Sequence, residues 1–267
     1  MKRLEFVSRV IRERPPRRVL DMGCGTGARL TAPLAERFPE VAFLGVDTDE
    51  PSIEAARATA GSLPNLSFAR ADELSDGATY DLVLAAEVLE HVEDTVAFLD
   101  GLVRLAGAGG RLVVTVPNGY GPFELCALIE VAMNLTGVQA LLRAARNAVR
   151  GARPGAGGGA SPGSLAVSPH LNFFSHGELL RLFEGAGCRL RAFQPTTFLC
   201  GYGLDILLKG EGVIAWNARI ADRLPRWCAS DWMFELEPGA PRRAISWRAS
   251  ALNRARRGLN RRRWGLA

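Results

Sequence analysis

Four acidic residues follow short apolar segments in the first third of the chain: Asp21, Asp47, Asp72 and Glu87. Each apolar segment reads as a buried strand, and the carboxyl ends of parallel strands meet at one edge of a sheet. A row of carboxylates there suits a ligand that carries hydroxyls, amines and a positive centre. It does not suit a phosphate, for which a lysine or a helix end free of carboxylates would be expected.

The first of these acids lies within a glycine-rich segment, Val19–Gly27, in which three glycines occupy alternate positions. A strand that ends at glycines and continues as a helix leaves room for backbone to approach a ligand. The lysine of a phosphate-binding loop is absent, and the spacing is Gly-x-Gly-x-Gly rather than the usual dinucleotide pattern. Asp47 follows Gly25 by 22 residues, the distance at which an acid can bind two ribose hydroxyls.

The elements that would position these residues alternate regularly between strand and helix. Apolar runs predict strands at 18–20, 41–46, 66–69, 81–86 and 110–116, and periodicity predicts helices at 4–14, 28–38, 51–60 and 92–106. Farther along, we expect a helix at 175–186 with a capping box, strands at 189–193 and 231–236, and a helical piece at 213–224. Helix-length crossovers between strands predict an α/β fold with a doubly wound, mostly parallel sheet covered on both faces.

The ordered motifs resemble those of class I S-adenosylmethionine-dependent methyltransferases. Those motifs are Val19–Gly27, Gly45–Asp47, Ala71-Asp72 and Tyr80–Val83, and the match runs over about residues 17–118. The capped helix and the late strands continue it to about residue 237. The resemblance implies a Rossmann-like sheet of seven strands, a helical insertion after the fifth strand, and S-adenosylmethionine as the methyl donor.

The resemblance also implies roles for the residues that carry it. Gly23 and Gly25 would let the backbone meet the methionine part of the cofactor, with Asp21 ordering the turn. Asp47 would bind the ribose hydroxyls and Asp72 the adenine amine, and Glu87 counts among both the cofactor contacts and the catalytic residues. The alternative for Asp47 and Asp72 is that they only cap the helices that follow them.

A second motif, Glu87-Val88-Leu89-Glu90-His91, resembles the Glu-x-x-Glu-His of ubiquinone-biosynthesis O-methyltransferases. There the two acids and the histidine are implicated in holding a divalent metal. The resemblance therefore implies a metal site at Glu87, Glu90 and His91, with Mg²⁺ as a candidate ion, which would lower the pKa of a bound hydroxyl. Similar segments occur in related methyltransferases without a metal, so both readings stay open.

The chain has three histidines, and they limit the choice of a general base. His91 follows the fourth strand. His170 lies just before the capped helix, where related methyltransferases have a histidine that faces the acceptor; the alternative is a loop histidine that bonds to backbone. His176, on the first turn of that helix, is expected to be solvated.

The sequence divides into four parts. Residues 1–118 form the cofactor-binding half, 119–168 a helical lid insertion, 169–240 the rest of the domain, and 241–267 a basic tail. In the insertion, Tyr120, Phe123 and the helical pattern to about Arg150 favour an apolar or aromatic acceptor, although such a stripe is also typical of ordinary core. The segment 151–163, rich in Gly, Ala and Pro, reads as a flexible linker.

Charge and cysteine content set further limits. The net charge is +5, but nine arginines and no acid follow Glu237, so subtracting these nine charges leaves −4 for residues 1–237. The tail is compatible with an arm on membrane, an arm on nucleic acid, or a solvated, partly disordered end. Five cysteines without CxxC spacing argue against a disulfide framework or a zinc site and favour the cytoplasm, with peripheral membrane contact as an option.

These observations predict a small-molecule methyltransferase that acts on oxygen by in-line displacement. A nucleic-acid enzyme would usually show Asp/Asn-Pro-Pro-aromatic after the fourth strand, where this chain has Glu87-Val88-Leu89-Glu90. The alternatives are a methyltransferase on nucleic acid or lipid at a membrane surface, and, by analogy of fold alone, an NAD-type oxidoreductase. The glycine spacing and Asp72 oppose the last of these.

Overall fold

The computed structural model describes residues 2–107, 109–121, 136–138, 170–198, 210–239 and 250–264. The expected linker at 151–163 lies outside these residues, and so does the expected helical stretch at 123–150 apart from residues 136–138. The boundaries of the lid and of the other parts therefore stay predictions.

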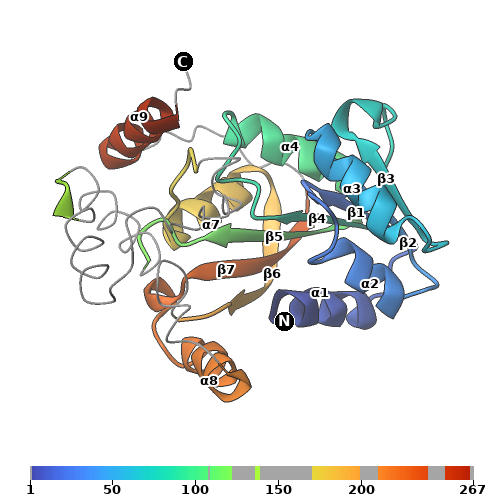
Figure 1. Cartoon of the computed structure of the whole chain (residues 1–267), viewed down its shortest axis with the longest axis horizontal. Coiled ribbons are helices and arrows are strands. Elements are labelled where there is room, and N and C mark those ends of the chain that lie inside the picture. The colour runs from blue at the N-terminus through green and yellow to red at the C-terminus, as the bar shows by residue number, and fades with distance from the viewer. Residues whose placement is uncertain are drawn as a thin grey trace, which may run out of the picture.

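The seven strands form one sheet in the order β3-β2-β1-β4-β5-β7-β6, shown in Figure 1. Their bounds are β1 (Arg18–Met22), β2 (Ala42–Asp47), β3 (Leu66–Arg70), β4 (Leu82–Ala86), β5 (Arg111–Pro117), β6 (Cys188–Pro195) and β7 (Asp231–Pro238). Strands β1 to β5 are parallel, and β7 runs antiparallel between β5 and β6. The predicted Rossmann-like, mostly parallel sheet of seven strands is confirmed.

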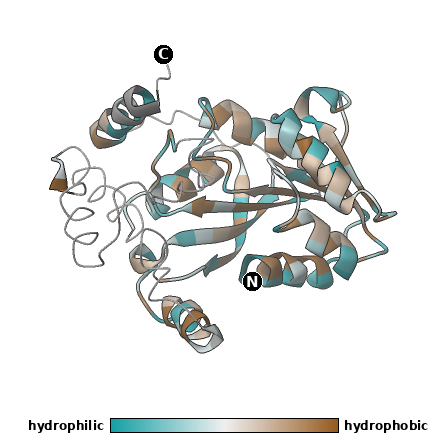
Figure 2. Cartoon of the chain, in the orientation of Figure 1, coloured by the Kyte–Doolittle hydropathy of each residue, from teal (hydrophilic) through white to brown (hydrophobic). Residues whose placement is uncertain are grey.

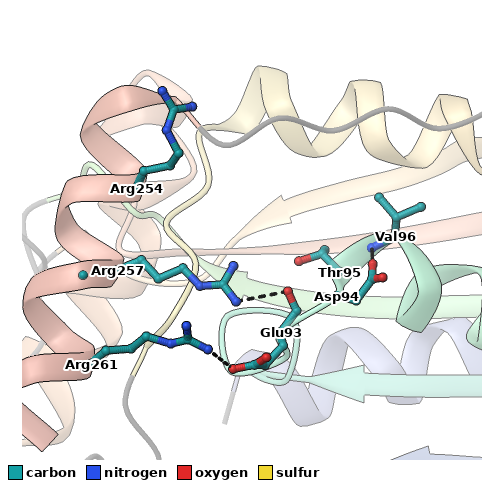
Figure 3. Close-up of a pocket in the computed structure, with 8 residues that line it drawn as sticks. Glu93, Asp94, Thr95, Val96, Arg254, Arg257 and Arg261 are labelled. Atoms are coloured by element: carbon teal, nitrogen blue, oxygen red, sulfur yellow. Dashed lines mark hydrogen bonds and ion pairs between the residues drawn. The ribbon is translucent and has the colours of Figure 1, made fainter. Parts of the chain in front are cut away.

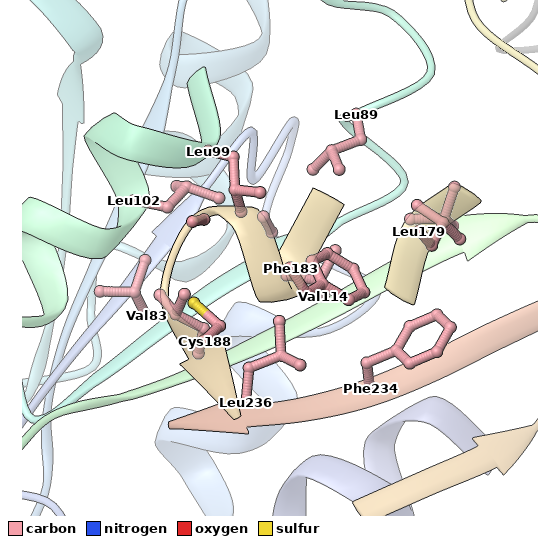
Figure 4. Packing of buried hydrophobic residues seen from close by; sticks show 14 of the residues in the cluster. Val83, Leu89, Leu99, Leu102, Val114, Leu179, Phe183, Cys188, Phe234 and Leu236 are labelled. Carbon is pink, nitrogen blue, oxygen red and sulfur yellow. The ribbon is translucent and has the colours of Figure 1, made fainter. Parts of the chain in front are cut away.

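Helices cover both faces of this sheet. Their bounds are α1 (Lys2–Glu13), α2 (Thr31–Arg37), α3 (Glu50–Ala60), α4 (Thr95–Ala106), α7 (His176–Gly185), α8 (Glu211–Ala221) and α9 (Ala251–Trp264). Apolar residues of α1, α2 and α3 pack with the strands on one face, and those of α4 and α7 pack on the other. Figure 4 shows the second of these layers, with α4 and α7 meeting the middle strands.

The middle strands are apolar on both sides because both sides are covered. Leu82 and Leu84 of β4 pack with the α1–α3 layer, and Val83 between them packs with α4 and α7. All three are at most 1% exposed. Figure 2 shows the apolar character along the middle of the sheet. This explains why continuous apolar runs, rather than alternating ones, marked the strands in the sequence.

Capping residues set the helix ends that position the site. In α7 the expected capping box is present: Ser175 Oγ accepts from the Glu178 N–H, and Glu178 Oε2 accepts from the Ser175 N–H at 2.8 Å. Helix α4 begins at Thr95 rather than at the expected Val92, because the Asp94 carboxylate accepts from the N–H groups of the first turn.

The basic tail differs from its expected form. Residues 251–264 form helix α9, in which Asn253 and Arg256 are buried. Of the three interpretations of the tail, a solvated, partly disordered end does not describe this stretch, which is a helix with two buried polar residues. In Figure 1, α9 lies beyond the end of the sheet toward which the β5 arrow points. Within the described residues, no helix combines the length and apolarity needed to cross a membrane.

Candidate functional site

The turn after β1 is built from glycines in left-handed conformations. Gly23, Gly25 and Gly27 have φ angles of +78°, +54° and +67°, which disfavour side chains. A Cβ on Gly23 would lie 2.5 Å from a methyl carbon of Val88, so this glycine is needed for close packing. A Cβ on Gly25 would meet no described atom within 4 Å. Gly25 therefore presents bare backbone to open space, as a ligand-binding turn requires.

Asp21 lies at the end of β1, under this turn. Its side chain is buried, and its Oδ2 accepts a hydrogen bond from Thr31 Oγ1 at 2.6 Å. Its Oδ1 has no hydrogen-bond partner among the described residues. Burial raises the pKa of Asp21 to about 6, against the opposing effect of the Thr31 hydrogen bond. Helix α2 begins at Thr31, three residues after the expected start at Ala28, so Asp21 ties the strand to the first residue of the helix.

Asp47 ends β2 and lies beside the glycine turn. Its Oδ2 accepts from the Gly25 N–H at 2.8 Å, and its Oδ1 accepts from the Asp49 N–H at 3.0 Å. The structure thus brings together two residues that sequence reasoning had paired by a spacing of 22. The helix-capping alternative applies to Asp49 instead, whose carboxylate accepts from the Ser52 N–H at the start of α3.

Asp72 is less closely joined to this group. It lies in a short 3₁₀ turn (Ala71–Glu73) after the edge strand β3, and its side chain is exposed. Its carboxylate forms two hydrogen bonds with Arg70, at 2.9 and 3.2 Å, and this guanidinium lowers the pKa of Asp72. The contact with the adenine amine stays a prediction, and it would have to accommodate this pair.

Glu87 follows β4 with a φ of +59°, the one positive φ among the described non-glycine residues. Its Oε1 accepts from Thr115 Oγ1 at 2.8 Å and lies 2.8 Å from Nη2 of Arg3. Burial raises the pKa of Glu87, and the positive charge of Arg3 opposes that shift. A positive φ in such a residue costs free energy and recurs at functional sites.

Sequence reasoning missed Arg3. Helix α1 begins at Lys2, before the expected residue 4, and its first turn brings Arg3 to Glu87, directly after β4. The charge of Arg3 also acts on Asp21. A single arginine in an amphipathic N-terminal helix gives no sequence signal. Only the row of acids at the sheet edge suggests that a positive charge is needed beside them.

Glu90 is the most deeply buried acid of this edge, at 1% exposure. Neither of its carboxylate oxygens has a hydrogen-bond partner among the described residues. Burial, with the nearby charge of Glu87, holds the pKa of Glu90 well above its ordinary value. A buried carboxylate without hydrogen bonds is costly, and such a group calls for a partner of opposite charge or a proton.

Two histidines lie next to this carboxylate. Glu90 Oε1 is 3.7 Å from His91 Nε2, and the rings of His91 and His170 meet edge to face, 5.0 Å apart. One ligand atom from each of these three residues lies within 4.8 Å of the others. This group differs from the expected metal set of Glu87, Glu90 and His91, which stays a prediction; Thr115 and Arg3 both contact Oε1 of Glu87. In this group His170 takes the place of Glu87.

These residues suit a metal ion in principle. One carboxylate and two imidazoles form a donor set typical of first-row transition ions, whereas Mg²⁺ prefers oxygen ligands. The buried, unpartnered oxygens of Glu90 are the observation that favours a cation here.

The backbone of the His170 segment is clasped onto the loop after β4. The Glu90 carbonyl accepts from the N–H groups of Leu171 and Asn172, at 2.7 and 2.9 Å. The Asn172 amide donates to the carbonyls of Leu89 and Val92. Asn172 was not singled out in the sequence, since an asparagine in a loop gives no signal of the distant backbone that it binds.

His176 is not solvated as expected. Its ring lies against Phe193, Trp232 and Phe234, with centroids 4.9 to 5.6 Å apart. Burial lowers the pKa of His176, so the neutral form is favoured in this aromatic cluster. The structure thus separates His176, as a packing residue, from the facing pair His91 and His170.

Comparisons with known proteins show which proteins the chain resembles in sequence and in fold. A family model described as a methyltransferase domain matches residues 2–192. The trans-aconitate 2-methyltransferase of Deinococcus radiodurans is 39% identical over 111 residues, which are 42% of this chain and 42% of that protein. The ubiquinone biosynthesis O-methyltransferase of Sinorhizobium fredii is 37% identical over 105 residues, which are 38% of this chain and 41% of that protein.

Among solved structures, the fold is similar to that of magnesium protoporphyrin IX methyltransferase from Synechocystis with bound SAH. The TM-score is 0.50 and the sequence identity is 17%, and the alignment covers 89% of this chain and 83% of that one. This likeness concerns the fold. The chain spans about two fifths of the length of the curated relatives that it matches.

Proposed function

The chain belongs to the class I S-adenosylmethionine-dependent methyltransferases, and from that premise we propose that it methylates an oxygen atom of a small, apolar or aromatic molecule. The names of the two curated relatives support a small acceptor, since one refers to trans-aconitate and the other to O-methylation in ubiquinone biosynthesis. The observation that carries the choice of oxygen is the pair of facing imidazoles, His91 and His170, beside the buried Glu90.

The cofactor side of the proposal rests on Gly25 and Asp47. The open backbone at Gly25 is where the methionine part of the cofactor can approach. Asp47 already accepts two backbone N–H groups, one at each oxygen, but an ionised carboxylate has about four acceptor positions. Two positions therefore stay available for the ribose hydroxyls. Gly23 shapes the turn, and Asp21 anchors it from below through Thr31.

The transfer itself is an in-line displacement from a sulfonium, so the chain mainly has to align donor and acceptor and to exclude water. A hydroxyl acceptor must also lose a proton. His91 or His170 removes it as a general base. Glu87 is held by Thr115 and Arg3 directly after β4. In the sequence it lies between the cofactor turn and the two histidines, and it is a polar contact for the cofactor and for the acceptor.

A metal ion is the alternative to a histidine base, because an imidazole that binds a metal has no nitrogen left to accept the proton. Glu90, His91 and His170 would hold a divalent ion, which would lower the pKa of the acceptor hydroxyl when bound. The donor set favours a transition ion over the Mg²⁺ expected from the sequence.

The alternatives receive less support. The described arginines of α9 that contact the body are engaged by backbone and by Glu93, which leaves them less available to a membrane or to nucleic acid. The match to a methyltransferase domain gives an NAD-type oxidoreductase no support.

The test of the proposed function uses the full chain with S-adenosylmethionine carrying a labelled methyl group. Binding is measured by calorimetry, and transfer is measured to a panel of phenols and carboxylic acids, with the matching amines as controls. We expect binding of the cofactor and transfer to an oxygen acceptor. Transfer to amines alone would refute the choice of oxygen, and the absence of cofactor binding would refute the whole proposal.

A further inference from the structure

Helix α9 is docked by one face. Asn253 is completely buried and Arg256 is 7% exposed, whereas Leu252, which directly precedes Asn253, is 57% exposed. The helix is rich in arginine, and burial of its polar residues calls for specific partners. Polar side chains of this helix contact the two segments that carry the candidate catalytic histidines, and Arg256 also contacts Gly119.

The first segment is the one that begins with His170. Asn253 Oδ1 accepts from the Phe173 N–H at 3.3 Å, and Asn253 Nδ2 donates to the Phe173 carbonyl at 3.0 Å. One side chain thus satisfies both backbone polar groups of a single residue. The Arg256 guanidinium lies 3.6 Å from the centre of the Phe173 ring and donates to the Gly119 carbonyl, at the end of β5.

The second segment is the loop that carries His91. Arg257 donates to the Glu93 carbonyl at 3.3 Å, and Arg261 pairs with the Glu93 carboxylate. Figure 3 shows both arginines reaching from α9 to Glu93, across a groove of about 610 Å³. Glu93 is two residues beyond His91, so the helix grips this loop close to the imidazole.

Gly119 and Phe173 also lie on either side of the stretch 122–169. The Gly119 N–H donates to the Phe174 carbonyl at 3.0 Å, and there is no room for a Cβ on Gly119 because Phe173 backbone would lie 2.6 Å away. The described backbone before and after this stretch meets at this contact, and Arg256 contacts Gly119 on one side and Phe173 on the other.

We propose that α9 is an active-site clamp, in which Asn253 and Arg256 hold the His170 segment while Arg257 and Arg261 hold the His91 loop, so that the two imidazoles face each other. The catalytic role of this clamp rests on the proposed function, in which one of the two histidines is the base. Asn253 and Arg261 are positioning residues, because their polar contacts are with Phe173 and Glu93 and they act through these residues. Helix α9 of the basic tail therefore supports the part of the site where the methyl acceptor would bind.

The histidine content makes the clamp directly measurable. Since the chain has three histidines, selective isotope labelling gives three sets of imidazole NMR signals, which His→Gln variants assign. His176, packed on β6 and β7, is an internal control. The clamp variants are Asn253→Ala and Arg261→Ala, and Leu252→Ala is the matched control on the exposed face of the same helix.

In Asn253→Ala we expect the His91 and His170 signals to move and the contact between the rings to weaken, while the His176 signal stays in place. In Arg261→Ala the His91 signal moves, and Arg261→Lys restores it because the charge pair with Glu93 is kept. Leu252→Ala leaves all three signals in place. Unchanged His91 and His170 signals in either clamp variant would overturn the proposal. If Asn253→Ala fails to fold, the Arg261 pair of variants decides alone.

Calorimetry with S-adenosylmethionine on the same samples tests cofactor binding separately from the position of the histidines. We expect the clamp variants to bind the cofactor as the unmodified chain does, because Asp47 and Gly25 lie outside the clamp. Failure of the unmodified chain to bind the cofactor would refute the proposed function. The NMR comparison would still decide whether α9 holds the two histidines together.

Discussion

His91 and His170 face each other edge to face, with their ring centroids 5.0 Å apart, although they come from different segments of the chain. His91 follows β4, whereas His170 precedes α7, and the backbone of Glu90 joins the two segments through the N–H groups of Leu171 and Asn172. The carboxylate of Glu90 lies beside the pair without a hydrogen-bond partner among the described residues. This relationship leads to the first prediction.

We predict that Zn²⁺ or Mn²⁺ binds at Glu90, His91 and His170 more tightly than Mg²⁺ does. His170→Gln should weaken binding of the transition ion roughly 100-fold or more, because it removes one of three ligands. Glu87→Gln should leave it nearly unchanged, since Thr115 and Arg3 engage that carboxylate. Calorimetry and histidine NMR on the metal-free chain measure both effects. A loss of binding in Glu87→Gln with retention in His170→Gln would restore the ligand set expected from the sequence.

Asp47 tests the cofactor site. Asp47→Ala should weaken binding of S-adenosylmethionine by a factor of about 10 to 100, because it removes the ribose contacts and frees the Gly25 N–H. Asp81→Ala is the matched control, since Asp81 also accepts two backbone N–H groups, from Arg17 and Arg18, but at the opposite edge of the sheet. It should lower stability and leave cofactor affinity intact. Equal affinity in Asp47→Ala and the unmodified chain would remove Asp47 from the site.

Two glycines of the turn should respond differently to the same substitution. Both Gly23→Ala and Gly25→Ala place a side chain at positive φ, at a cost of about 1 to 2 kcal/mol. In Gly23→Ala the added methyl also meets Val88, so its thermal stability should fall further. In Gly25→Ala the methyl points into the space proposed for the cofactor, so loss of affinity should exceed loss of stability. Thermal unfolding with and without S-adenosylmethionine compares the two, and an equal ligand-induced shift would argue against contact at Gly25.

The sheet could be predicted from the sequence because its signals are local. The continuous apolar runs of β4 and β5, the glycines after β1 and the capping box of Ser175 and Glu178 each reflect the physics of neighbouring residues. The contacts that complete the site are not local. Arg3 reaches Glu87 from the first helix, and nothing in the residues around Arg3 encodes that contact.

The docking of the basic tail also depends on contacts between residues that are distant in the sequence. A run of arginines without acids is compatible with an arm on membrane, an arm on nucleic acid or a solvated end, and its composition does not decide between them. The docking of α9 depends on Asn253 meeting the backbone of Phe173, which composition cannot reveal. Likewise, the motif Glu-x-x-Glu-His suggested Glu87 as a ligand, whereas the fold sends that side chain to Thr115 and places His170 beside Glu90.

The last prediction concerns pH and follows from Asp21. The pKa of Asp21 is about 6 in the folded chain, above its ordinary value of 3.8, because the carboxyl is buried. Above pH 6 the folded state carries the full cost of an ionised buried carboxylate. As the pH falls from 6 toward 4, the folded state takes up a proton that the unfolded state still lacks, so this group's contribution to stability rises. At 1.36 kcal/mol per pKa unit, the full change across both pKa values is about 3 kcal/mol.

Asp21→Asn isolates this contribution, because an amide can still accept from Thr31 and carries no charge at any pH. Between pH 6.5 and pH 4 we expect the free energy of unfolding of the unmodified chain to rise by about 2 kcal/mol relative to that of Asp21→Asn, measured by denaturant titration. Other acids that are paired in the folded state stabilise it less as the pH falls. Because both proteins contain these acids, their contributions cancel in the difference between the two free energies of unfolding. A difference that is constant with pH would show that Asp21 ionises normally, and the buried environment at the end of β1 would then be wrong.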